Sequence, residues 1–523
     1  MTQRILCIHA FLFTFFTLAL FFSQPAFARN TKDDIKTLEH IFGDVLEQYK
    51  DLAKSGDAEL VTEGKIMVEP SGSYYAVTLP HMRLEQADGS YTDIGMISVN
   101  TLPGDTSEQW KMTVALPTPI IYYDSQNKSS VTVEIKNQNF AGIWHETLKN
   151  FIKLNAQYGD IIITQSDDQT RISIPVMKVI ADMTPDGKGL WSGSGDVILS
   201  GLHAHSDRTG GDVRLGEMKI TSTVKDYSFD AVLDYQEKIS ALTESQSGQG
   251  KKASSAHVMG LYNLIADFMG SAWDGFGVTV AVRDFSLSMP KTAKASARNF
   301  KMDHSKLGFN MTGFRSGLVT MGITSAYDGL QTFAMSAEDK ALVPDHVNID
   351  LSINNLPYKE MAELGRTSLQ GVTETPQAGA LVGMNAAMML PQLLTKAQTN
   401  LTLKNTYVGN NDYNILTNAM MKADLKAALG ATGNARTEIY GIDYLVDSFN
   451  KIVSRPDLGE ARKTKIQKSL AMLSVIKMVG QMEKDAKGRD IRTYHLELNE
   501  QGQTLLNGTD LKALMETLNS TRQ

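Results

Sequence analysis

The motif with the clearest chemical potential is His203-Ala204-His205-Ser206-Asp207. It follows an alternating run from Asp196 to Leu202, a pattern that predicts a β-strand. If the strand continues through the motif, His203, His205 and Asp207 lie on one face, because strand side chains repeat every two residues. Two imidazoles and a carboxylate can bind zinc and leave a coordination position for water, as in metal-dependent hydrolases. The competing interpretation is a solvated strand end, since a chain with ten histidines will contain a close pair by chance.

Other short motifs give weaker signals for catalysis. Trp144-His145-Glu146 could pair an acid and a base, but neighbouring side chains on a helix diverge, which favours a partly buried Trp beside a surface His-Glu pair. Ser192-Gly193-Ser194-Gly195 lacks the glycine pattern of a nucleophile elbow. The sequence contains no phosphate-binding Gly-x-x-x-x-Gly-Lys loop, no dinucleotide fingerprint and no cysteine-based metal site. We therefore expect a non-enzymatic protein without a cofactor. The alternative is a zinc-dependent hydrolase.

Residues 1–28 have the pattern of a secretory signal peptide. Arg4 precedes an apolar run from Ile5 to Phe22, and the small-residue site Ala26-Phe27-Ala28 follows. We expect cleavage after Ala28 and a periplasmic protein. The alternative is that the apolar run stays as an inner-membrane anchor, with the chain facing the periplasm. The only cysteine, Cys7, lies in this segment, and an exported chain without disulfides is typical of bacteria rather than of eukaryotic secretion.

The net charge limits the classes of partner. The chain has 51 basic and 58 acidic residues, a net charge of −7, and loss of Arg4 with the signal peptide leaves −8. This balance argues against nucleic acid as a partner. It also gives no overall attraction to anionic lipid, although a local basic patch such as Lys251-Lys252 could place the protein near a membrane.

The pattern of apolar residues predicts a β-rich first half. Residues 29–56 carry apolar side chains at three- and four-residue spacing and predict an N-terminal helix. Residues 57–244 form short alternating runs, with a hairpin turn at Asp88-Gly89, and predict a large antiparallel meander. The Ser-, Gly- and Gln-rich residues 245–255 predict a flexible linker.

Residues 256–523 predict an α+β second half. Two methionine-rich segments, residues 378–399 and 466–484, have helical spacing, and Pro391 should kink or break the first. Three units of strand, polar turn and short helix predict a sheet whose strands lead into capping helices. An equally weighted alternative is ordinary α+β texture without a repeat. The three strands and their helices are Val131–Ile135 with Ile143–Phe151, Val347–Leu351 with Tyr358–Leu364, and Ala435–Tyr440 with Tyr444–Ile452.

The closing segment has a related pattern. Tyr494, Leu496 and Leu498 alternate, Glu500-Gln501-Gly502 forms a turn, and Thr504-Leu505-Leu506 follows. With the export signal, the alternating strands and the strand-to-helix units, this segment resembles the periplasmic families of Gram-negative bacteria that include the YdgA-like and, more distantly, the AsmA-like proteins. The resemblance implies an elongated, curved antiparallel sheet with an apolar concave face, and a role in envelope maintenance or lipid handling. It carries over no catalytic residues.

Together these patterns predict a β-rich α+β fold with large curved antiparallel sheets and short capping helices. We expect an exported envelope protein that binds an apolar or lipidic component or an envelope-assembly partner. One alternative is the metal-dependent hydrolase centred on His203, His205 and Asp207. The other is a structural or surface-interaction protein that uses exposed strand edges.

Overall fold

The computed structural model describes most of the chain beyond the predicted signal peptide. The described residues are 31–126, 128–166, 169–244, 255–291, 297–332, 335–374, 379–456 and 458–514. The signal peptide predicted for residues 1–28 and residues 245–254 of the predicted linker lie outside these ranges. Within them, no helix is both long enough and apolar enough to cross a bilayer.

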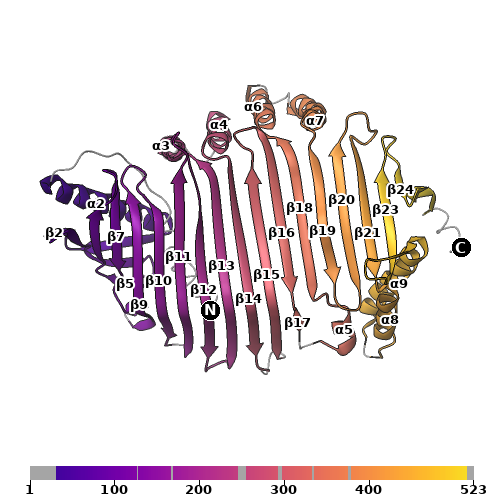
Figure 1. Cartoon of the computed structure of the whole chain (residues 1–523), viewed down its shortest axis with the longest axis horizontal. Coiled ribbons are helices and arrows are strands. Elements are labelled where there is room, and N and C mark those ends of the chain that lie inside the picture. Colours follow the sequence, from indigo (N-terminus) through magenta and orange to yellow (C-terminus); the bar gives the residue numbers. More distant parts are fainter. Residues whose placement is uncertain are drawn as a thin grey trace. The chain divides into compact units, whose positions relative to one another are not determined.

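The chain forms two compact units. Unit 1 comprises Met1–Thr223 and Phe285–Ala295, and unit 2 comprises Val224–Asp284 and Ser296–Gln523. The division falls within the strands β13 (Gly211–Tyr227) and β14 (Gly275–Met289), whereas the sequence suggested residues 245–255 as the boundary. Both units are built on antiparallel strands accompanied by helices, which confirms the predicted β-rich α+β class (Figure 1).

The N-terminal helix of unit 1 packs into a core formed with short strands. Helix α2 spans Thr31–Ser55, which confirms the helix predicted for residues 29–56. Its stripe of apolar side chains is buried, with Leu38 fully inaccessible, and shares one core cluster with Val77 and Trp110. The short strands are β1 (Ala58–Glu63), β2 (Met67–Ser71), β3 (Tyr74–Thr78), β4 (His81–Gln86), β5 (Tyr91–Gly95), β6 (Ser98–Pro103), β7 (Gln109–Ala115) and β8 (Ile120–Tyr123). The predicted Asp88-Gly89 turn joins β4 to β5.

Four long strands continue unit 1 as an antiparallel meander. They are β9 (Ser129–His145), β10 (Asn150–Gln165), β11 (Thr170–Pro185) and β12 (Trp191–Ser206). The helix predicted for residues 143–151 is wrong, because these residues form the β9–β10 hairpin, with His145 opposite Asn150. Lys149 adopts a left-handed conformation in this turn (φ 41°) and its Nζ donates to Asp44 Oδ2 of α2 at 2.5 Å. That conformation is incompatible with a continuous helix.

Unit 2 contains a large antiparallel sheet in which neighbouring strands follow one another along the chain. Seven strands pair in the order β15, β16, β18, β19, β20, β21, β23. The strands are β15 (Arg298–Thr312), β16 (Leu318–Asp328), β17 (Gln331–Thr332), β18 (His346–Pro357), β19 (Asn400–Gly409), β20 (Asn414–Ala423), β21 (Ala431–Tyr440), β22 (Gln481–Lys484), β23 (Asp490–Leu498), β24 (Thr504–Leu506) and β25 (Thr509–Asp510).

Helices of unit 2 lie at the ends of these strands. Helices α3 (Phe229–Glu244), α4 (Ser255–Ser271), α6 (Tyr358–Glu374) and α7 (Gly379–Lys396) form a row along one edge (Figure 1). The other helices are α5 (Ala337–Ala341), α8 (Ile442–Val453) and α9 (Glu460–Val479). Aromatic contacts fix the row to the sheet: Phe268 of α4 contacts Trp273, and Phe314, which is fully buried, contacts Tyr358 at the start of α6.

The helical predictions for unit 2 are largely confirmed. Two of the three predicted strand-turn-helix units are present, because β18 leads into α6 and β21 leads into α8. Both methionine-rich segments contain helices, α7 and α9. Helix α7 continues past Pro391, so the predicted break does not occur there. The helix predicted up to residue 484 ends at Val479, and residues 481–484 form β22.

Candidate functional site

The histidine pair lies where the sequence predicts, on one face of a strand end. His203 and His205 belong to β12 and stand opposite Ser173 and Arg171 of β11. Ala204, between them, stands opposite Ile172, whose side chain packs against a core cluster of unit 1. The two imidazoles therefore lie on the polar side of this sheet, and both are close to half exposed.

Asp212, which the sequence analysis did not identify, connects the two histidines. Its Oδ2 lies 2.6 Å from His203 Nε2 and 3.6 Å from His205 Nδ1. Asp207 approaches only the second imidazole, with Oδ1 3.2 Å from His205 Nε2. The structure therefore brings His205 and Asp207 together as predicted, but the carboxylate between both rings comes from β13. The signal that could have revealed it is the turn at Gly210, after which the next strand runs back beside β12.

The electrostatics of this cluster are those of an ion-pair network. Arg214 Nε donates to Asp212 Oδ1 at 2.9 Å. Hydrogen bonds from His203 and then Arg214 hold the pKa of Asp212 below its ordinary value. In the part of the chain that the structure describes, no group of three or more His, Cys, Asp or Glu side chains has an arrangement suited to a metal ion. The zinc site at His203, His205 and Asp207 stays a prediction, and the guanidinium beside Asp212 competes with a cation there.

A second cluster of the same composition lies in unit 2. Asp328 stands directly between His304 and His346 in a row across β15, β16 and β18. Its Oδ1 lies 2.9 Å from His346 Nδ1, and its Oδ2 lies 3.9 Å from His304 Nδ1. No local sequence pattern predicts this cluster, because its three members are far apart in the chain and only the strand register brings them together.

The most extensive feature of unit 2 is a sheet face made of apolar side chains. The register places apolar residues of successive strands side by side in two rows. The first row is Phe309, Ile323, Leu351, Leu403, Ala419, Ala435 and Leu496, and the second is Met311, Met321, Ile353, Leu401, Met421, Gly433 and Leu498. We call these two rows, together with Leu307 and Ile349 on the same side, the apolar face.

The opposite face of the same strands is mostly polar, with Met420 as an exception. Its central row is Asn310, Gly322, Ser352, Thr402, Met420, Asn434 and Glu497. Hydrogen bonds join its side chains, with Ser352 Oγ 2.6 Å from Thr402 Oγ1 and Asn354 Nδ2 donating to Asn400 Oδ1 at 2.9 Å. An alternation of this kind normally has its apolar side against a core.

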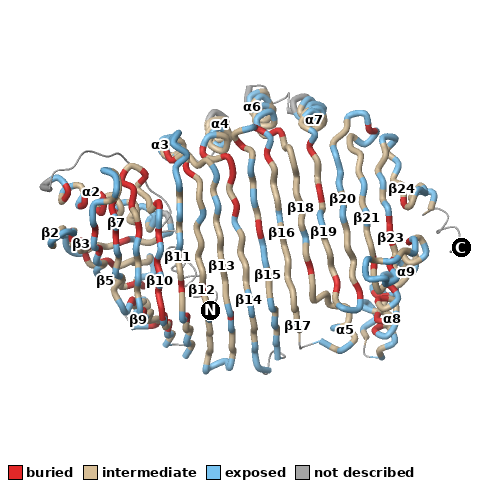
Figure 2. The backbone as a smooth tube through the Cα atoms, viewed as in Figure 1, coloured by how far each residue is buried: buried red, intermediate tan, exposed pale blue. Residues whose placement is uncertain are grey.

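Much of the apolar face is nevertheless accessible to solvent. Leu307 is 57% exposed, Ile323 43% and Met421 44%, and most residues of these strands are only partly buried (Figure 2). At the C-terminal end of the sheet the same side is covered, because Ile476 and Val479 of α9 pack against a buried cluster that includes Tyr494. Large accessible apolar patches are uncommon on monomeric proteins and mark binding surfaces.

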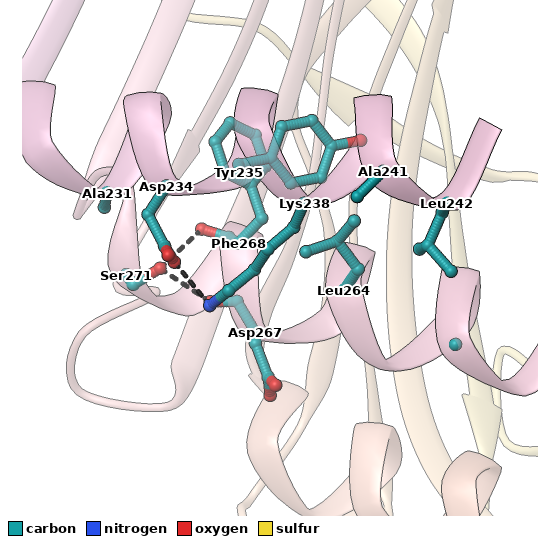
Figure 3. Close-up of a pocket in the computed structure, with 11 residues that line it drawn as sticks. Ala231, Asp234, Tyr235, Lys238, Ala241, Leu242, Leu264, Asp267, Phe268 and Ser271 are labelled. Carbon is teal, nitrogen blue, oxygen red and sulfur yellow. Dashed lines mark hydrogen bonds and ion pairs between the residues drawn. The ribbon is translucent and has the colours of Figure 1, made fainter. Parts of the chain in front are cut away.

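A smaller hollow lies between α3 and α4. It has a volume of about 360 Å³ and is lined by apolar side chains such as Leu242, Leu264 and Phe268. Its charged groups all have partners, since Lys238 Nζ donates to Asp234 Oδ2 at 2.6 Å (Figure 3) and Asp267 pairs with Arg366 of α6. Because these charges are already paired, the hollow is a weaker candidate for ligand binding than the apolar face.

Comparisons with known proteins assign no family to the chain: neither the family models nor the curated protein sequences give a match. The functional argument therefore depends on the residues and the geometry described above.

Proposed function

We propose that this chain is an exported, non-enzymatic protein of the Gram-negative cell envelope that binds an apolar or lipidic component along the apolar face of unit 2. The observation that carries the proposal is the pair of apolar rows, which run across the strands and are partly open to solvent while the opposite face is mostly polar. The resemblance of the sequence to periplasmic envelope families and the signal-peptide pattern of residues 1–28 support the compartment.

The geometry of the rows suits an extended acyl chain. Neighbouring strands are about 4.8 Å apart, so a row that crosses the six strands from β15 to β21 extends roughly 24 Å. An acyl chain bound along such a row would transfer its methylene groups from water to an apolar surface. This transfer favours binding by about 0.8 kcal/mol per methylene. The cost of immobilising the ligand reduces this gain, so affinity depends on how many methylenes lie on the face.

Native mass spectrometry tests the proposal on protein purified gently from the exporting cell. We expect extra mass of lipid size in the native protein, and a loss of that mass in the variant Ile323→Gln/Met421→Gln. The matched control is Met420→Gln, because Met420 is 45% exposed like its neighbour but lies on the polar face. We expect the control to keep its ligand.

Three results would count against the proposal. A native mass equal to that of the bare chain would favour the structural or surface-interaction protein. Equal loss of ligand from both variants would show that the apolar face is not the site. Extra mass of one zinc ion that disappears in His203→Ala/His205→Ala would favour the hydrolase.

A further inference from the structure

Helix α9 is basic in an acidic protein. It contains five Lys or Arg residues and one Glu, whereas the whole chain has a net charge of −7. The basic patch suggested by the sequence, Lys251-Lys252, lies outside the described residues, whereas α9 is a positive segment that the structure describes.

Three of the five cations of α9 have acidic partners. Arg462 Nη2 lies 2.5 Å from Asp339 Oδ1, and Lys463 Nζ lies 4.0 Å from Glu460 Oε1. Lys477 pairs with Asp443 of α8. Lys465 and Lys468 are exposed, and neither has an ion pair with any described residue. These two ammonium groups are therefore available to an anionic partner.

In the part of α9 that precedes Ile476, the unpaired lysines share one side of the helix with an exposed methionine. Lys465, Lys468 and Met472 occupy positions i, i+3 and i+7, which follow one another along a helix surface. Met472 is 67% exposed. Ile466, which is buried, lies on a different side of this part of the helix.

We propose that the stripe formed by Lys465, Lys468 and Met472 docks on the surface of an anionic phospholipid bilayer. Lysine ammonium groups attract anionic headgroups near the surface. Their methylene stems and the flexible side chain of Met472 can enter the boundary between headgroups and acyl chains while the charges stay in water. Charge complementarity thus selects a lipid surface over an apolar protein groove. The inference is independent of ligand binding on the apolar face.

Vesicle flotation with the protein purified from the exporting cell tests this inference. The vesicles are neutral phosphatidylcholine, or an equal mixture of phosphatidylcholine and phosphatidylglycerol. We measure the ratio of binding to the two kinds of vesicle, so that any charge-independent attachment cancels. The test variant is Lys465→Ala/Lys468→Ala, and the matched control is Lys404→Ala/Lys422→Ala, which removes two exposed lysines from the sheet.

We expect preferential binding to the anionic vesicles. Removing two lysines at about 1 kcal/mol each corresponds to a roughly 30-fold weaker preference in the test variant, and the control should keep the preference. Met472→Ser should weaken binding in the same direction. Equal binding to both kinds of vesicle, or equal loss in test and control variants, would overturn the proposal. The apolar-face variant Ile323→Gln/Met421→Gln should dock normally, so failure of ligand binding and failure of docking are distinguishable.

Discussion

At the scale of single residues, the environment of His145 makes a prediction about pH. The ring is 8% exposed at the end of β9, and its Nε2 lies 3.4 Å from Glu108 Oε2. Burial lowers the pKa of His145, and the attraction of Glu108 offsets this only in part. The surface His-Glu pair predicted from the sequence is wrong, because Trp144, His145 and Glu146 are all buried. Glu146 accepts a hydrogen bond from Trp110 Nε1 at 3.3 Å.

A lowered pKa means that the unfolded chain binds the proton more tightly than the folded one. The contribution of His145 to the free energy of unfolding should therefore be fully present above the ordinary histidine pKa of about 6.5. It should decrease as the pH falls from that value to the lower pKa of the folded state. We expect His145→Gln to lose less stability than the parent protein between pH 7.5 and pH 5. Urea unfolding followed by tryptophan fluorescence measures this, and an equal loss in both proteins would contradict the assignment.

The two histidine clusters show what sequence can reveal about such sites. His203 and His205 could be placed on one strand face because their spacing is local. Asp212 comes from the next strand, and the row of His304, Asp328 and His346 depends on the register of three strands. Register is set by turn geometry and by bulges, including one between Val319 and Met321, which a pattern of residue types does not specify.

At the scale of elements, Asp274 connects the ends of β13 and β14 with the turn between β15 and β16. Its Oδ2 accepts from Lys225 Nζ at 2.7 Å, its Oδ1 accepts from the Arg315 backbone N–H at 3.1 Å, and its carbonyl accepts from Gly313. Burial would raise the pKa of this carboxyl, but hydrogen bonds from Lys225 and Arg315 outweigh it and leave the pKa below its ordinary value. The carboxylate is thus held ionised where β13, β14 and the β15–β16 turn meet.

We expect Asp274→Ala to lower the free energy of unfolding by about 2 kcal/mol, since hydrogen bonds to a charged group contribute about 1.5–3 kcal/mol. Asp234→Ala is the matched control. Asp234 also pairs with a lysine, Lys238, but both side chains are more than half exposed, so the loss should stay below about 0.5 kcal/mol. Chemical unfolding of the two variants beside the parent measures both values, and equal losses would contradict the structural role of Asp274.

Element types were predicted better than element boundaries. Alternation identified the strands of unit 1 and the Asp88-Gly89 turn, and apolar spacing identified α2, α7 and α9. The helix prediction for residues 143–151 is wrong because the spacing of Ile143, Leu148 and Phe151 also fits a helical stripe. In the structure, the 17-residue strand β9 ends in this segment and the β9–β10 hairpin turn follows. The apolar face was expected only through resemblance, because membership of one face depends on the register of many strands.

At the scale of the whole molecule, the two proposed interactions of unit 2 differ in physical origin. The chain has a net charge of −7, so docking on an anionic surface depends on short-range attraction to the exposed Lys465 and Lys468 of α9. Salt screens this attraction, with a Debye length of about 10 Å at 0.1 M and about 3 Å at 1 M. Burial of an acyl chain on the apolar face involves no net charge and is not screened.

We therefore expect salt to separate the two interactions. Raising the salt concentration from about 0.1 M to 1 M should release the protein from anionic vesicles and leave its lipid-sized ligand in place, as measured by flotation and by native mass spectrometry of the same preparation. The protein is moved into the volatile buffer for mass spectrometry only after the salt treatment. Any ligand that dissociates in high salt is therefore removed before its mass is measured. Simultaneous loss of both would mean that the ligand and the bilayer occupy one surface, and that Lys465 and Lys468 act together with the apolar face rather than separately from it.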